Sequence, residues 1–399
     1  IAAYKCVQLA RDLTLLGAGV DVVLTRSARR FVGPTSFEGV TGRPVRTSLW
    51  KVDSAAEHIR LGSGAHVAIV APATADLMAR LAAGRADDLL TTTLLVTEAP
   101  VLVAPAMNDR MWADLRTRRN AGVLADLPGW RLVGPGTGAL AVGEGRGAGR
   151  MVEPERLLLE SGRALAGNTD PLSGRTVLVT TGGTREALDT VRFVGNRSTG
   201  QMGLEIALEA WLRGALVTVV QGPGGAVAPD LPEDSFRVVR VESAREMLEA
   251  TLPEVPSADL QVYAAAVSDY RPEEAAATKR KRSDTGERWS VELVENPDIA
   301  LRSREHSGPG SIRVGFALET EDLVESARDK RSRKGFDLVV ANPAGRTDAG
   351  FESGTNRGFL VGADDVTELP PDSKAAMAGR VLDAAGALLA RGPRSGEPT

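Results

Sequence analysis

Residues 176–184 read Thr-Val-Leu-Val-Thr-Thr-Gly-Gly-Thr, and this stretch decides the fold class. Its first six residues are β-branched or apolar, which is typical of a strand buried on both faces. The pair Gly182-Gly183 then predicts a tight turn where the strand ends. A helical pattern over residues 203–213 and a strand pattern over residues 216–220 follow. This order predicts a parallel βαβ unit.

Outward from this unit, strand and helix patterns alternate in both directions. In the second half we expect further strands over residues 260–265, 289–294, 313–317 and 338–341. In the first half we expect strands over 20–25, 67–71 and 101–104, with helices over 75–83 and 153–166. The sequence therefore predicts an α/β protein with two domains, 1–166 and 175–390, joined by a polar linker, 167–174. We expect the tail, 391–399, to be disordered.

The chain starts with a helical pattern over residues 2–16, with Tyr4, Val7, Leu9, Leu13 and Leu16 on its apolar face. An α/β domain usually opens with a strand and a glycine-rich turn that lead into such a helix. We therefore expect this opening strand and turn to precede the sequence given. Glycine is dense between residues 134 and 149, which predicts a mobile flap over a site.

Composition excludes several classes of protein. A net charge of −4 and an aromatic content of 4% disfavour a nucleic acid as partner, because neither a basic field nor stacking residues are available. No apolar run is long enough to predict a transmembrane segment. The single cysteine, Cys6, excludes an intrachain disulfide framework and a cysteine-based zinc site, and it suits the reducing cytoplasm.

Three features of the first half are candidates for a site. Residues 71–76 follow a strand pattern and open a helix that Thr74 or Asp76 could cap, so they are either a phosphate or flavin site or a plain helix start. Asn108 ends another strand pattern and could hold a carboxylate or an amide. His58 is one of three histidines, and a lone histidine is more often structural than catalytic. For His66 and His306 we keep that structural interpretation.

In the second half, the turn at 182–186 matches neither the Gly-x-Gly-x-x-Gly fingerprint nor a Gly-Lys-Ser/Thr loop, which disfavours a dinucleotide dehydrogenase and a P-loop ATPase. Residues 192–203 are rich in groups that bind anions. The run Lys279-Arg280-Lys281-Arg282 has three interpretations: a solvated surface, a nucleic-acid contact, or a loop that closes over a triphosphate.

In order and spacing, residues 1–5, 58–59, 71–76, 105–108 and 149–151 resemble the flavin-dependent cysteine decarboxylases. The closest resemblance is to the decarboxylase half of the bifunctional phosphopantothenoylcysteine decarboxylase/phosphopantothenate–cysteine ligases. This resemblance implies a flavodoxin-like, doubly wound parallel sheet that binds FMN along Thr25, Ser27, Pro72 and Thr74. It also implies that His58 assists the proton and hydride chemistry and that Asn108 holds the substrate carboxylate.

The flap departs from this family's pattern. Where the family has a cysteine that donates the last proton, this sequence reads Ala141-Val142-Gly143. Glu144 or a water could donate the proton instead, reduction could be slow, or the decarboxylase could be inactive.

The second half resembles the ligase half of the same family through residues 182–186, 196–203, 264–270, 296–299, 315–317 and 330–334. The resemblance implies a Rossmann-like domain in which CTP and Mg2+ activate phosphopantothenate as an acyl-cytidylate, and cysteine then displaces CMP. Asn196 is expected to stabilise the acyl-cytidylate, and Lys279 and Lys281 to belong to a mobile loop. The residues expected to bind CTP are Tyr263, Ala264, Ala265, Asp269, Lys279, Pro297, Asp298, Ile299, Ala300, Phe316, Lys330 and Lys334.

The leading hypothesis is therefore a bifunctional enzyme of coenzyme A biosynthesis that ligates cysteine and then decarboxylates phosphopantothenoylcysteine. The alternatives are a ligase with a structural first half, and a flavin- and nucleotide-binding or DNA-associated module. The resemblance further implies a homo-oligomer, with trimeric decarboxylase halves, dimeric ligase halves and a dodecamer overall.

Overall fold

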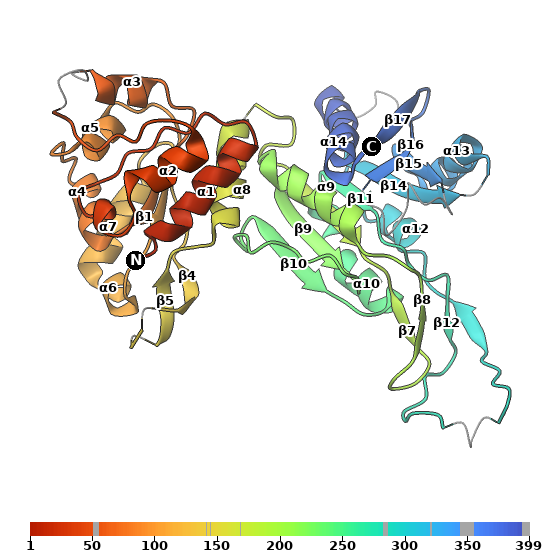
Figure 1. Cartoon of the computed structure of the whole chain (residues 1–399). Coiled ribbons are helices and arrows are strands. Elements are labelled where there is room, and N and C mark those ends of the chain that lie inside the picture. The colour runs from red at the N-terminus through yellow and green to blue at the C-terminus, as the bar shows by residue number, and fades with distance from the viewer. Residues whose placement is uncertain are drawn as a thin grey trace. The chain divides into compact units, whose positions relative to one another are not determined.

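Two α/β patterns along the sequence correspond to two compact units, Ile1–Leu165 and Ala166–Thr399 (Figure 1). The computed structural model describes residues 1–50, 56–140, 142–143, 145–167, 169–281, 286–319, 321–343 and 355–392. The expected tail falls outside these residues from position 393 onward. Each unit has hydrophobic clusters of its own, so each is described separately.

The first unit has a parallel sheet in the order β1-β2-β3 with helices packed around it. The sheet strands are β1 (Ala68–Ala73), β2 (Val101–Pro105) and β3 (Trp130–Leu132), and every residue of β2 is buried. An antiparallel hairpin, β4 (Gly136–Ala139) and β5 (Arg146–Arg150), stands where the flap was predicted. The helices are α1 (Ala3–Leu15), α2 (Pro34–Thr41), α3 (Glu57–Ser63), α4 (Ala75–Ala82), α5 (Leu89–Leu95), α6 (Asp109–Ala113), α7 (Leu115–Ala125) and α8 (Pro154–Ala166), with a short 3-10 helix at Ala28–Arg30.

The strand predicted over residues 20–25 is wrong. Its backbone pairs only at the bridge between Val23 and Arg46, where Leu24 donates to Arg46 and Arg46 donates to Val22. Pro44 lies two residues before Arg46 and has no N–H, so it has no donor with which to extend this pairing. The apolar side chains of the segment instead pack against α1 and α2.

Helix α1 was correctly predicted, but its buried face only in part, since Leu9 is buried and Val7 and Leu13 are partly buried. Tyr4 and Leu16, both assigned to the apolar face, are 62% and 73% exposed. Lys5 is buried instead, because its ammonium donates to the Met151 carbonyl at 3.1 Å and pairs with Glu153 at 3.0 Å. Hydrophobic periodicity alone could not predict this polar anchor.

The second unit contains one eight-stranded sheet in the order β10-β9-β6-β11-β14-β15-β16-β17. Neighbouring strands are parallel from β10 to β15, and β16 and β17 are antiparallel additions at one edge. The strands are β6 (Thr176–Thr181), β9 (Leu216–Gln221), β10 (Phe236–Arg240), β11 (Leu260–Tyr263), β14 (Ile312–Glu319), β15 (Leu338–Pro343), β16 (Thr355–Val361) and β17 (Val366–Ser373). The helices are α9 (Gln201–Leu212), α10 (Ala244–Thr251), α12 (Ile299–Arg304), α13 (Leu323–Lys334) and α14 (Lys374–Arg391), with a 3-10 helix at Val255–Ser257.

Two short hairpins extend away from this sheet, as Figure 1 shows for β7, β8 and β12. One pairs β7 (Arg185–Ala187) with β8 (Phe193–Gly195), and the other pairs β12 (Tyr270–Pro272) with β13 (Leu293–Glu295). The strand predicted over residues 289–294 is therefore mostly wrong. The paired residues of β13 are only Leu293–Glu295, with one further bond from the Glu273 N–H to the Glu292 carbonyl at 3.0 Å. The ring of Trp289 lies under the Arg192 guanidinium instead.

The predicted α/β class and the parallel sheets are confirmed. Across the described ranges, no helix combines the length and the hydropathy needed to cross a membrane.

Candidate functional site

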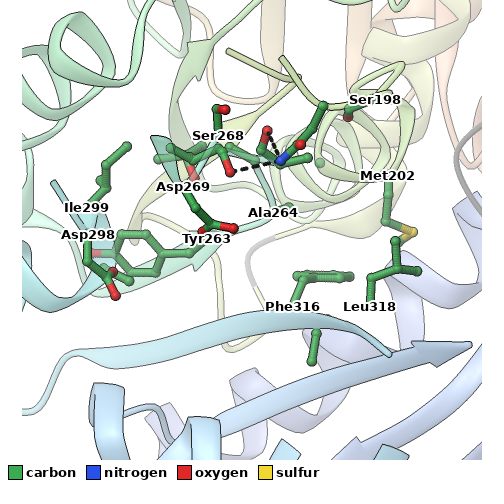
Figure 2. Close-up of a pocket in the computed structure, with 18 of the residues that line it drawn as sticks. Ser198, Met202, Tyr263, Ala264, Ser268, Asp269, Asp298, Ile299, Phe316 and Leu318 are labelled. Atoms are coloured by element: carbon green, nitrogen blue, oxygen red, sulfur yellow. Dashed lines mark hydrogen bonds between the residues drawn. The ribbon is translucent and has the colours of Figure 1, made fainter. Parts of the chain in front are cut away.

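A cavity of the second unit lies where neighbouring parallel strands end. Strands β6, β11 and β14 are adjacent, and residues from the carboxyl end of each line a cavity of about 940 Å³. Open α/β sheets bind ligands at this edge because loops and helix starts converge there. The lining includes all the residues predicted to bind CTP except Lys279, and it also includes Asn196. Figure 2 shows how Ala264, Asp269, Asp298 and Phe316 surround the space.

Asn196 directly follows β8 and is held by the loop after β11. Its amide donates to the Val267 carbonyl at 2.9 Å and, more weakly, to the Ala266 carbonyl at 3.4 Å. The same residue lines a second, smaller cavity of about 280 Å³. Asn196 therefore lies where the two cavities meet, and its side chain can contact a ligand bound in either one.

The end of the cavity formed by α12 and α13 is ionic. Asp298 caps α12 by accepting from the Leu301 N–H at 3.1 Å, and it pairs with the Lys334 ammonium at 2.9 Å. Burial acts to raise the pKa of Asp298, but Lys334 and the Leu301 N–H together hold that pKa below its usual value. Asp298 is therefore ionised at neutral pH and fixes the position of Lys334.

Lys330, one turn before Lys334 on α13, donates to the Phe316 carbonyl at 2.6 Å. Burial is the main cause that lowers the pKa of Lys330, and the positive charge of Lys334 adds to it. A partly desolvated ammonium beside a cavity is well suited to bind an anion.

A buried arginine supports the wall behind these groups. Arg313 is 4% exposed, and its guanidinium lies 5.3 Å from the Tyr263 ring centroid and 5.4 Å from that of Phe336. It donates to the carbonyls of Ala300 and Lys334, the latter at 2.7 Å. These contacts link α12 to the end of α13. The ring of Tyr263 thus belongs to the supporting core, and its hydroxyl donates to Gln261 at 2.9 Å.

Lys279 is exposed and does not line either cavity described above. The neighbouring Arg280 is bound outside the cavities, because its N–H donates to Asp189 at 3.2 Å and its carbonyl accepts from Arg192 at 2.8 Å. Lys281 is also exposed, and Arg282 lies outside the described residues. The structure therefore does not bring Lys279, Arg280 or Lys281, the described part of the basic run, to either cavity.

In the first unit, two predicted residues follow adjacent parallel strands. Thr74 follows β1 and caps α4 by accepting from Leu77 at 3.3 Å, whereas Asp76 lies in the first turn of that helix. Asn108 follows β2 and caps α6 by accepting from Arg110 at 3.0 Å. The register pairs Ala73 with Pro105, so Thr74 and Asn108 belong to the same edge of the sheet.

The other predicted flavin residues come from separate elements. Pro72 lies in β1, and the Thr25 hydroxyl accepts from the Ala28 N–H at 3.1 Å, beside Ser27 at the start of the 3-10 helix. His58 lies on α3, and its Nδ1 is buried with no hydrogen-bond partner in the described part of the chain. No hydrogen bond between described residues joins His58 to Asn108.

The hairpin of β4 and β5 is attached to the loop that carries Asn108. The Met107 N–H donates to the Gly149 carbonyl at 2.9 Å, and a Cβ at position 149 would lie 2.3 Å from the Met107 carbonyl oxygen. Only glycine therefore fits this contact. Val142 lies at the tip of the hairpin and is fully exposed, while Glu144 lies outside the described residues.

Comparison with known families covers almost the whole chain. The flavoprotein family model matches residues 1–161, and the model of the DNA/pantothenate metabolism flavoprotein C-terminal domain matches residues 172–388. The Coenzyme A biosynthesis bifunctional protein CoaBC of Mycobacterium bovis is 44% identical over 98% of this chain and 95% of its own. That of Vibrio vulnificus is 40% identical over 96% of this chain and 94% of its own.

The chain belongs to this family of bifunctional coenzyme A biosynthesis proteins. Among solved structures, the C-terminal domain of a Coenzyme A biosynthesis bifunctional protein CoaBC is 32% identical. It covers 56% of this chain and 100% of its own, with a TM-score of 0.47.

Family membership makes the chain a bifunctional enzyme with a decarboxylase half, which is a flavoprotein, and a ligase half. The alternative of a ligase with a purely structural first half is not favoured, because the relatives that match across both halves are bifunctional.

Several cavity residues of this family member were not predicted from the sequence. They are Leu318, Glu319, Asn342, Asn356 and Lys374, whereas Met202 and Arg333 lie within the stretches 196–203 and 330–334 of the resemblance. Asn342 could have been found, because it directly follows the strand pattern 338–341. Asn356 and Lys374 come from the antiparallel edge of the sheet. No pattern in the sequence predicted that this edge would reach the cavity.

Proposed function

We propose that the second unit joins phosphopantothenate to cysteine at the expense of CTP, and that the first unit decarboxylates the resulting phosphopantothenoylcysteine to phosphopantetheine with FMN. The observation that carries the ligase assignment is the cavity at the ends of β6, β11 and β14. One cavity there gathers residues that are far apart in the sequence, from Asn196 to Lys334.

Ligation needs activation because the leaving group of a free carboxylate would be oxide. A phosphopantothenate carboxylate oxygen attacks the α-phosphorus of CTP, which releases pyrophosphate and forms an acyl-cytidylate. The amine of cysteine then attacks the acyl carbon, and CMP leaves with the bonding electron pair. Asn196 stabilises the acyl-cytidylate by hydrogen bonding, and Lys330 and Lys334 offset the negative charge of the nucleotide phosphates.

Mg2+ enters this proposal as part of the substrate. Among the described residues, no group of three or more His, Cys, Asp or Glu side chains could hold a metal ion. A divalent cation that arrives bound to the triphosphate needs few protein ligands of its own.

For the decarboxylase, Thr25, Ser27, Pro72 and Thr74 would hold FMN. The buried Nδ1 of His58, which lacks a partner among the described residues, fits a site that a further polar group completes. Bound FMN would supply the two-electron redox chemistry before and after the loss of CO2. Asn108 would orient the substrate carboxylate, and His58 would exchange a proton with the substrate. Glu144 remains the candidate acid for the last protonation, since Val142 carries no proton to donate.

From the resemblance we also propose a homo-oligomer of trimeric decarboxylase halves and dimeric ligase halves, located in the cytoplasm. These points stay predictions, to be tested by mass measurement in solution and by fractionation.

The ligase assignment is tested by incubating the protein with phosphopantothenate, cysteine and CTP and following the products by mass. We expect phosphopantothenoylcysteine and CMP from the unchanged chain. Asn196→Asp should reduce ligation by about 100-fold, because a carboxylate would face the negative acyl-cytidylate. Asn120→Asp on α7, in the first unit, is the matched control at a half-buried position. Normal ligation by Asn196→Asp would remove the proposed role of Asn196, and no CTP consumption by the unchanged chain would overturn the ligase assignment.

A further inference from the structure

One wall of the larger cavity carries uncharged side chains that the proposed mechanism leaves without a function. Figure 2 shows Met202 and Leu318 together, on the side of the cavity away from Asp298. Two asparagines, Asn342 and Asn356, line the same cavity. We call the side chains of Met202, Leu318, Asn342 and Asn356 the amide wall.

The sheet places the members of the amide wall next to one another. In the parallel pairing of β14 with β15, Leu318 is the partner of Asn342. The Asn356 amide contacts the Met202 sulfur at 4.0 Å. Two residues after Asn356 on β16, a Cβ at Gly358 would lie only 3.0 Å from the Asn342 Oδ1. The glycine therefore leaves room for the Asn342 side chain between β16 and the cavity.

Asn342 has an acceptor that no described residue uses. The residue is 9% exposed, and its Oδ1 is buried with no hydrogen-bond partner in the described part of the chain. An unpaired buried acceptor destabilises the fold. The torsion that turns the amide plane is broad in asparagine, so a small rotation presents this oxygen to the cavity that the residue lines. An acceptor kept at a cavity wall at a cost to stability is expected to serve a ligand.

The position of the nucleotide decides which substrate reaches the amide wall. In the proposed mechanism, Lys330 and Lys334 of α13 offset the charge of the nucleotide phosphates. In the acyl-cytidylate, the nucleoside and the pantothenate part are bonded to the same phosphate, so they extend from it in different directions. With the nucleotide at the α13 end, the pantothenate part extends toward the amide wall.

The chemistry of that part of the substrate fits the amide wall. Between its carboxylate and its phosphate, phosphopantothenate carries an amide, a secondary hydroxyl and a carbon with two methyl groups. The hydroxyl and the amide N–H are donors that match the Asn342 Oδ1. The two methyl groups match the apolar side chains of Met202 and Leu318, of which Leu318 is 41% exposed.

We infer that Asn342 accepts a hydrogen bond from the hydroxyl or the amide N–H of phosphopantothenate, and that this bond selects the substrate. The inference rests on the proposed ligase function. A site with a buried acceptor rejects an analogue that lacks the donor, because the acceptor then stays unpaired in the complex.

The test pairs a change in the residue with a change in the substrate, using the full chain. The unchanged chain and Asn342→Leu each receive phosphopantothenate, its analogue with hydrogen in place of the hydroxyl, and its analogue with an ester oxygen in place of the amide N–H. The kcat/KM for each is measured with CTP and cysteine in excess. The unchanged chain should use one analogue about tenfold less well than phosphopantothenate. In Asn342→Leu this difference should shrink below about twofold, and the analogue affected identifies the donor.

Thr218→Val is the matched control, because Thr218 is a polar residue of β9 that is 8% exposed and lines neither cavity. This variant should keep the preference of the unchanged chain among the three substrates. A purely structural role of Asn342 would lower kcat/KM for all three by the same factor, so equal losses in Asn342→Leu would overturn the inference.

Two further outcomes would overturn it. One is that the unchanged chain uses both analogues as well as phosphopantothenate. The other is that Asn342→Leu raises the KM for CTP alone, which would place the nucleotide at the amide wall. An unchanged chain that does not consume CTP would instead refute the proposed function itself.

Discussion

Lys330 ties the electrostatics of the ligase cavity to a measurable pH dependence. Burial, together with the charge of Lys334, lowers its pKa below the usual lysine value of 10.5. The lysine therefore loses its positive charge at a lower pH than an exposed lysine does. We expect kcat/KM for CTP to fall on the alkaline side below pH 10.5, and we expect Lys330→Met to lose this limb along with about tenfold in kcat/KM.

The measurement is release of pyrophosphate in the absence of cysteine, so that titration of the cysteine amine and thiol does not contribute. The free energy of unfolding changes with pH in the opposite direction to CTP binding. Between the lowered pKa of the folded state and 10.5, the unfolded chain binds more protons, so the free energy of unfolding rises with pH while CTP binding weakens. An alkaline limb that persists unchanged in Lys330→Met would assign the titration to another group.

Among individual residues, those that follow parallel strands could be predicted as site residues from the sequence. Those that tertiary contacts bring to the site could not. Ala264 and Phe316 were predictable because motifs of the resemblance mark them in the sequence and the sheet brings them to one edge. Lys374 was not, because it enters the cavity only through the pairing of β16 with β17. Lys279 shows the converse, since a run of charge along the chain does not determine which surface the run will face.

Helices α12 and α13 form the ionic end of the cavity, and Arg313 is one of the side chains that join them. Its guanidinium donates to carbonyls at the end of α13 and to Ala300 in α12. Arg313→Met would leave these buried carbonyls without their donor. We expect a loss of about 3 kcal/mol in the free energy of unfolding and a higher KM for CTP, because Asp298 and Lys334 would lose their spacing.

Chemical denaturation of the full chain, together with CTP kinetics, checks this expectation. The control is Arg175→Met, which removes an arginine that is 47% exposed and paired with Asp259. Exposed pairs contribute about 0–1 kcal/mol, so this variant should unfold almost as the unchanged chain does. If Arg313→Met were no more destabilised than Arg175→Met, Arg313 would not be the link between the two helices.

The elements themselves were predicted best where a pattern was long and buried. Strand β6 has the predicted bounds, because all but the first of its six residues are buried and the periodicity is therefore unambiguous. The expected strands over 20–25 and 289–294 failed because each finds little to pair with among the described residues: a single bridge to Arg46 for the first, and the three residues of β12 for the second. A strand pattern shows that a segment suits a sheet, but the pairing depends on a partner elsewhere in the chain.

At the scale of the whole molecule, the two units catalyse two separate steps. The product of the second unit is the substrate of the first. Each unit has its own core and its own candidate site, so a substitution in one should leave the chemistry of the other intact. His58→Asn should still ligate cysteine and accumulate phosphopantothenoylcysteine. Asn196→Asp should make about 100-fold less, but should still decarboxylate phosphopantothenoylcysteine that is added to it.

Mixing the two variants then tests whether the intermediate passes through solution. A phosphopantothenoylcysteine molecule released by His58→Asn can diffuse to the intact first unit of Asn196→Asp, so the mixture should form phosphopantetheine faster than either variant does alone. Product mass against time is the readout, and the rate should rise with the concentration of the Asn196→Asp partner. If the mixture accumulates phosphopantothenoylcysteine without converting it, while added phosphopantothenoylcysteine is still decarboxylated by Asn196→Asp, the intermediate is retained by the molecule that made it.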